Sequence, residues 1–236
     1  MSNLKSFFLT LTALSLLAVG YSAAGTVTGK INFKGAKPAA TQIKMNADPK
    51  CVKMHSGKDV ASEQVVVNPN NTLRYVFVYV KKGLEGKKFP VPTDKKTIDQ
   101  KGCMYSPHMF GVMAGQPIEI SNDDATLHNI HALPKNSKQF NIAQPKQGMK
   151  TTQKFDKAEV MVKIKCEVHN WMASYVGVLD HPFYAVSDEQ GNFTIKNLPA
   201  GDYELEAWHE KFGTMSAKVT VGASDTKTAD FTFAGQ

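Results

Sequence analysis

The sequence predicts an all-β protein built from packed β-sheets, on three observations. Short runs in which apolar and polar residues alternate recur along most of the chain, as half-buried strands require. Clusters of Gly, Pro, Asn and Asp separate these runs and are typical of turns. Helical periodicity is almost absent after residue 24. The pattern therefore favours β-sandwiches over any mixed fold.

The N-terminal residues have the composition of a targeting segment. Lys5 is the only charged residue among residues 1–24, residues 7–20 form an apolar core, and the Ser-Ala-Ala of residues 22–24 offers a cleavage site. The apolar run is short for a membrane span. We expect a cleaved signal peptide, a periplasmic or otherwise secreted protein, and a mature chain that starts at Gly25 without a membrane span. An uncleaved N-terminal anchor is the alternative.

The chain is moderately basic. Its formal net charge of +7 falls to +6 when Lys5 is removed with the signal peptide. The lysines are scattered and no nucleic-acid-binding motif accompanies them, so nucleic acid is not an expected partner. An ordinary solvated surface is one interpretation of these charges, and attraction to an acidic partner protein is the other.

The expected strands begin directly after the signal peptide. Residues 27–33 alternate and end in a Gly- and Pro-containing turn. Residues 73–80 are almost entirely apolar, as in a central strand of a sandwich, and the polar residues 81–96 contain two prolines and form a loop. Residues 118–121 alternate again and lead into an Asn-Asp-Asp turn.

One short stretch, residues 166–172, carries the chemistry. In the alternating run before it, Val160, Val162 and Ile164 share a face with Cys166, so the thiol should point inward. The chain must then turn to bring His169 and Met172 back toward the sulfur. A thiolate, an imidazole and a thioether are three of the ligand types of a blue-copper site, which needs a second histidine.

The second histidine lies upstream, in Asn-Asp-Asp-Ala-Thr-Leu-His-Asn at residues 122–129. This stretch, followed about forty residues later by Cys-x-x-His-x-x-Met, resembles the cupredoxins. The short ligand loop is most similar to that of amicyanin, and the resemblance covers residues 105–180. It implies a cupredoxin Greek-key β-sandwich over residues 60–182 and one type 1 copper ion. The implied ligands are His128, Cys166, His169 and Met172.

The choice of His128 over His131 rests on the resemblance. The two residues are an odd number of positions apart, so on one strand they face opposite ways and only one can join Cys166. Both faces carry apolar neighbours, so alternation does not decide. The family ligand is the histidine that Asn follows, which selects His128 and leaves His131 as the alternative ligand. Asn129 would then tie the two ligand segments together by hydrogen bonds.

An exported protein with three cysteines raises the question of which thiol stays free. With Cys166 in the ligand loop, Cys51 and Cys103 remain to form a disulfide. Such a bridge would stabilise the fold by about 3–5 kcal/mol.

The C-terminal residues predict a second, smaller domain. After residue 183, four alternating runs are separated by turns. Residues 191–203, Gly-Asn-Phe-Thr-Ile-Lys-Asn-Leu-Pro-Ala-Gly-Asp-Tyr, resemble the carboxypeptidase regulatory-like, transthyretin-like β-sandwich. That family begins with a Gly-x-Val-x-Gly strand, which matches residues 25–29. Residues 25–40 would thus supply the first strand of a domain formed by residues 183–236, with the cupredoxin domain inserted. The whole layout is similar to exported plastocyanin-like "methylamine utilisation" proteins.

The function expected from this resemblance is single-electron transfer between redox partner proteins, with no enzymatic turnover. A periplasmic copper carrier or buffer is an alternative, and so is a structural β protein with a vestigial metal site. In a cupredoxin-like site the loop histidine reaches the surface. His169 is therefore the expected port for electrons, with Asn170, Trp171 and Met172 around it.

Overall fold

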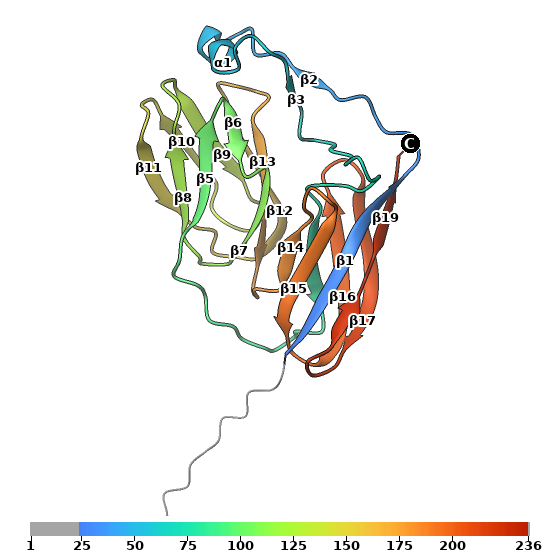
Figure 1. Cartoon of the computed structure of the whole chain (residues 1–236). Coiled ribbons are helices and arrows are strands. Elements are labelled where there is room, and N and C mark those ends of the chain that lie inside the picture. The colour runs from blue at the N-terminus through green and yellow to red at the C-terminus, as the bar shows by residue number, and fades with distance from the viewer. Residues whose placement is uncertain (1–23, 236) are drawn as a thin grey trace, which may run out of the picture.

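The computed structural model of this chain describes residues 24–235, which form two β-sandwiches joined side by side (Figure 1). The predicted signal peptide lies outside these residues apart from Ala24. Among the described residues, no helix is both long and apolar enough to cross a membrane.

The sandwich formed by residues 96–179 is called the central sandwich. One sheet has the strand order β10-β9-β12-β13-β7 and the other β11-β8-β5-β6. The bounds are β5 Lys96–Lys101, β6 Met104–Ser106, β7 Met109–Met113, β8 Ile118–Asn122, β9 His128–Leu133, β10 Phe140–Gln144, β11 Met149–Gln153, β12 Glu159–Lys165 and β13 Ala173–Leu179. Alternation places one face of each strand in the core, as at Val162 and Ile164.

The prediction for Val160 is wrong. A register shift between Glu159 and Val162 breaks the alternation of β12. Val160 therefore leaves the face that carries Cys166 and packs in the cluster between the two sandwiches.

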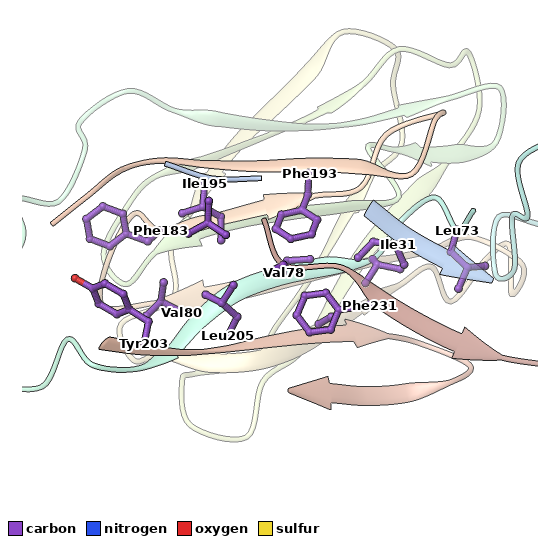
Figure 2. Close-up of a cluster of buried hydrophobic side chains, with 14 of the residues drawn as sticks. Ile31, Leu73, Val78, Val80, Phe183, Phe193, Ile195, Tyr203, Leu205 and Phe231 are labelled. Atoms are coloured by element: carbon purple, nitrogen blue, oxygen red, sulfur yellow. The ribbon is translucent and has the colours of Figure 1, made fainter. Parts of the chain in front are cut away.

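The second sandwich, called the terminal sandwich, combines the first described strand with the last ones. Its sheets are β15-β1-β18, with β19 also paired to β1, and β14-β4-β16-β17. The bounds are β1 Gly25–Lys34, β4 Phe77–Lys82, β14 Tyr184–Val186, β15 Asn192–Leu198, β16 Gly201–His209, β17 Gly213–Val221, β18 Thr226–Thr228 and β19 Phe231–Ala234. Figure 2 shows side chains from both sheets, among them Ile31, Val78, Phe193 and Leu205, meeting in one core.

In sequence, the central sandwich is inserted into the terminal one: β1 and β4 precede its strands, and β14 to β19 follow them. β1 pairs with β15 in antiparallel fashion and with β18 and β19 in parallel. Residues 77–82 belong to the stretch 60–182 for which the resemblance implies a copper domain. In the structure these residues form β4, which pairs with β14 and β16 of the terminal sandwich. By strand pairing, the central sandwich begins at β5.

Part of the segment between β1 and β4 forms a small cap, with α1 over one end of the central sandwich (Figure 1). Residues 42–61, called the cap here, comprise β2 Gln42–Ile43, the helix α1 Pro49–Met54 and β3 Val60–Ala61. Asp48 caps α1, since its side chain accepts a hydrogen bond from the backbone N–H of Lys50, and Pro49 occupies the first turn.

The two sandwiches pack through an aromatic interface. Phe77 and Tyr79 of β4 lie against Met109 of β7 and Leu179 of β13. The hydroxyl of Tyr184 donates to the carbonyl of Gly111 at 2.6 Å, which links β14 to β7.

Candidate metal centre

Three side chains from separate segments meet at the cap end of the central sandwich. Cys166 follows β12, His128 begins β9, and His169 lies in the turn before β13. The Nδ1 atoms of the two histidines are 3.0 Å apart, and Nδ1 of His169 is 4.0 Å from Sγ of Cys166. All three side chains are buried, with exposed fractions of 0%, 2% and 2% for His128, Cys166 and His169.

The positions of these atoms fit a single metal ion. Metal–nitrogen bonds are about 2.0 Å and metal–sulfur bonds about 2.3 Å, so two ligand atoms of one ion lie about 3 to 4 Å apart. Each histidine presents Nδ1 to the cluster, and its Nε2 is bonded to a carboxylate: His128 to Asp124 at 2.8 Å and His169 to Asp48 at 3.0 Å. An Nε2–H bonded in this way leaves Nδ1 as the lone-pair donor to a metal.

The electrostatics of the cluster favour a thiolate. Burial alone would raise the pKa of the Cys166 thiol. Hydrogen bonds from His128 and from the backbone N–H groups of Asn129, His169 and Val168 outweigh it, so the pKa is lowered. Burial alone would lower the pKa of His128, and the partners Asp124 and Cys166 outweigh it, so this pKa is raised. In both groups the hydrogen-bond partners thus outweigh the effect of burial.

The structure separates the two candidate histidines on β9. His128 joins Cys166 and His169, whereas His131 points away and its Nδ1 lies 2.6 Å from the Glu167 carboxylate. Asn129 connects the ligand segments, because its Oδ1 accepts from the backbone N–H of Glu167 at 2.5 Å.

Met172 lies in the same core as Cys166. Its side chain is fully buried, and its carbonyl accepts from the backbone N–H of Cys166 at 3.3 Å. A second backbone bond, from the Met172 N–H to the His169 carbonyl at 2.9 Å, closes the ligand loop. The loop therefore holds its sulfur-bearing and imidazole-bearing residues within one tight turn.

The expectation that His169 reaches the surface is wrong. Only 2% of it is exposed, because the cap covers its Nε2 edge. Asp48 binds that edge, and Sγ of Cys51 lies 3.5 Å from the same nitrogen. Trp171 covers another side, with 5.0 Å between the ring centroids.

The cap is covalently fastened to the central sandwich. Cys51 of α1 and Cys103, which precedes β6, form a disulfide with an S–S distance of 2.02 Å, and Cys166 is the free thiol. Nε1–H of Trp171 donates to the Cys103 carbonyl at 3.0 Å. The disulfide, the tryptophan and the ligand histidine thus form one contiguous contact.

Sequence reasoning missed the two carboxylates. Asp124 lies four positions before His128 in a turn where Asn122 accepts from its N–H at 3.0 Å, a spacing that the sequence displays. Asp48 had a weaker signal, namely an Asp-Pro pair three residues before a cysteine expected to bridge to the copper domain. The covering of His169 by this segment depends on tertiary contacts alone.

Comparison with solved structures finds partial similarities. The chain is similar to a purple cupredoxin from Nitrosopumilus maritimus, with 24% identity and a TM-score of 0.31 over 35% of this chain and 98% of that one. For a copper-containing nitrite reductase from Thermus scotoductus SA-01, the identity is 15% and the TM-score 0.35, and the match covers 50% of this chain and 28% of that one. For a reduced mutant of amicyanin, the identity is 21% and the TM-score 0.32, and the match covers 37% of this chain and 85% of that one.

Comparison with curated proteins finds no match. A family model, the carboxypeptidase regulatory-like domain, matches residues 176–234. These residues contain β14 to β19, which together with β1 and β4 form the terminal sandwich. The resemblance stated from residues 191–203 is thereby confirmed: the C-terminal part of this chain is similar to a carboxypeptidase regulatory-like domain.

Proposed function

We propose that this protein binds one copper ion in a type 1 site and carries single electrons between redox partner proteins outside the cytoplasm. The observation that carries the proposal is the convergence of Sγ of Cys166 with Nδ1 of His128 and of His169 in a buried cluster. One thiolate and two imidazoles, together with a thioether of the kind that Met172 offers in the same buried core, are the ligand chemistry of blue-copper sites.

Each residue has a distinct role in this proposal. Cys166 supplies the thiolate, His128 and His169 the two nitrogens, and Met172 a weak axial sulfur. Bound copper supplies a one-electron couple. The ligands start from strand ends and a hydrogen-bonded turn, so the protein frame holds them in place during a redox change. No turnover of a substrate is part of the proposal.

The decisive experiment is an optical titration of the purified apoprotein with Cu(II). An intense blue, green or purple band from thiolate-to-copper charge transfer, saturating at one equivalent, is the expected result. A protein that binds no Cu(II), or binds it without such a band, refutes the type 1 assignment. Folded protein that binds no copper at all would instead favour a structural role with a vestigial site.

A second candidate is a copper carrier or buffer, and the burial of His169 beneath the cap favours it. A sealed ligand slows metal loss and also lengthens the path for electrons. The electron self-exchange rate separates the two functions, because an electron carrier must exchange rapidly and a buffer need not. Slow self-exchange together with copper transfer to an acceptor chelator would favour the buffer.

A further inference from the structure

The carboxylate of Asp48 joins the cap to the metal-binding cluster. Its Oδ2 lies 3.0 Å from Nε2 of His169 and accepts from the hydroxyl of Thr126 at 3.2 Å. Its Oδ1 accepts from the backbone N–H of Lys50 at 2.8 Å and so begins α1. One side chain therefore contacts the cap helix, the turn before His128 and the ligand loop.

Asp124 makes the equivalent contact on the other histidine. Its Oδ2 lies 2.8 Å from Nε2 of His128, and the carboxylate also accepts from the backbone N–H groups of Gly102 and Cys103 at 2.8 and 2.7 Å. Asp124 belongs to the central sandwich, whereas Asp48 comes from a segment outside it. The carboxylate that contacts His169 is thus supplied by the cap.

Several contacts keep the cap on the site. Nζ of Lys50 donates to the Ala125 carbonyl at 3.0 Å, next to Thr126. The Cys51–Cys103 disulfide adds a covalent tether, with both sulfur-bearing residues fully buried. These contacts of Lys50 and Cys51, both in the first turn of α1, hold the adjacent Asp48 in place.

Resting on the proposed metal site, we propose that Asp48 is a positioning residue that the cap supplies to it. The carboxylate keeps the proton of His169 on Nε2, which leaves Nδ1 free to bind the ion. Its negative charge, with that of Asp124, favours the higher charge state of a bound metal. The cap thus tunes the metal affinity and the reduction potential of a site built in another domain.

The key variant is Asp48→Asn. Asparagine is as good a helix cap as aspartate, so α1 keeps its first turn. The amide is neutral, and it presents either an NH₂ group or a weaker oxygen acceptor to Nε2–H of His169. We expect the affinity for Zn(II) and for Cu(II), each measured by chelator competition, to fall about 10–100-fold.

A change in reduction potential distinguishes the loss of the Asp48 charge from a loosened cap. Loss of the charge should weaken Cu(II) binding more than Cu(I) binding. For each tenfold change in the ratio of the two affinities, the potential rises by about 59 mV. Asp48→Glu, which keeps the charge, should restore most of the potential.

A control variant separates the role of Asp48 from a general effect of changing the cap. Asp59→Asn lies in the same cap but removes only a surface ion pair with Lys44, so metal affinity and reduction potential should equal those of the wild type.

The outcomes for the two proposals are distinct. Unchanged Zn(II) affinity and unchanged potential in Asp48→Asn overturn the inference, whatever the thermal stability of the variant. Wild-type protein that binds Zn(II) more tightly than Asp48→Asn but shows no charge-transfer band with Cu(II) overturns the proposed function and supports the positioning role.

Discussion

Cys166 combines two properties that rarely occur together in one cysteine. It is almost completely buried, and its thiol pKa is nevertheless lowered, because hydrogen bonds to the sulfur outweigh the cost of burial. A structural cysteine in an apolar core has the opposite shift and is inert. The pKa of the neighbouring His128 is raised, because its contacts with Asp124 and Cys166 outweigh the opposing effect of burial.

The first prediction concerns the ligand histidine. Cys166→Ser and His128→Ala should each abolish the charge-transfer band with Cu(II), because a hydroxyl or a methyl group cannot replace the soft thiolate or the imidazole. His131→Ala is the matched control, since its ring bonds Glu167 outside the cluster, and it should leave the band intact. Loss of the band in His131→Ala would reverse the ligand assignment.

His209 gives a prediction on pH. It is 1% exposed, and its Nδ1 accepts from the backbone N–H groups of Lys211 and Phe212 at 3.0 and 3.3 Å. Burial lowers its pKa from 6.5 to about 4. The unfolded chain therefore takes up a proton between these pH values and the folded chain does not. The neutral ring contributes up to about 3 kcal/mol of stability above pH 6.5, which is lost as the pH falls toward 4.

The corresponding experiment compares the free energy of unfolding of wild type and His209→Asn from pH 7 to pH 4. Asparagine can accept the same N–H groups and does not titrate, so its stability should decline less steeply over this range. Equal slopes for the two proteins would show that the folded and unfolded chains protonate His209 equally, and would contradict the lowered pKa.

The sequence revealed the residues that carry unusual chemistry but not those that orient them. A cysteine, a histidine and a methionine within seven residues are a rare combination, and the Asn after His128 distinguished it from His131. The structure indeed places Asn129 between the ligand segments. Asp48 gave no comparable signal, because exposed-looking Asp-Pro pairs commonly begin helices and its contact with His169 spans 121 positions.

Among the elements, the cap has the weakest structure of its own. α1 has six residues, too few for a stable isolated helix, and β2 and β3 have two residues each. Its small apolar core consists of Met45 and the disulfide, with Trp171 packed against them. The cap therefore depends on its tether and on its polar contacts with His169 and Thr126.

Removing the tether is the third prediction. The disulfide spans 52 positions, and in the chain-entropy model such a bridge is worth about 4 kcal/mol. The Cys51→Ser, Cys103→Ser variant should unfold at correspondingly lower denaturant concentration. Peptide mapping of non-reduced wild type should find these two cysteines joined and Cys166 free. A bridge to Cys166 in copper-loaded protein would contradict both the pairing and the site.

The elements that the sequence predicted well are those with uninterrupted alternation. Residues 193–195, 203–207 and 231–233 form β15, β16 and β19 with their apolar side chains buried. The strand before Cys166 shows where the rule fails, because a register shift moved Val160 to the interface. α1 escaped prediction since one and a half turns display no helical period.

At the scale of the whole molecule, the two sandwiches are locked by side chains inserted into gaps above glycines. A Cβ atom on Gly177 of β13 would lie 2.3 Å from Cζ of Phe77, which belongs to the other sandwich. Gly111 of β7 is covered in the same way by the ring of Tyr184. Nε2 of His108 adds a buried contact of 2.5 Å with Glu210.

Gly177→Ala is the fourth prediction. The added methyl should displace the Phe77 ring and destabilise the protein by about 1–3 kcal/mol. Phe77→Leu removes the ring atoms that clash, so the double variant should be more stable than the sum of the two single changes. A purely additive double-mutant cycle would show that the two residues do not press on each other.

The nested arrangement was predicted from residues 25–29, and β1 indeed pairs with β15, β18 and β19. The placement of β4 was not predictable. Both sandwiches contain buried, apolar central strands, and no local feature of residues 77–82 indicates which sandwich they join. Their partners in β14 and β16 lie a hundred or more positions later.

The pairing of β1 also predicts an order of folding. The backbone N–H of Lys30 donates to the Asp230 carboxylate, 200 positions away, so the terminal sandwich cannot close until its last strands are available. The central sandwich draws all its strands from residues 96–179 and has shorter loops to close. The two tryptophans report on different places: Trp171 lies beside His169, whereas Trp208 of β16 lies at the interface between the sandwiches, with its ring centroid 5.2 Å from that of Tyr175. In stopped-flow refolding of Trp171→Phe and Trp208→Phe, we expect fluorescence from Trp171 to reach its native value before that from Trp208. The cluster of Cys166, His128 and His169 would then be assembled before the interface with the terminal sandwich closes.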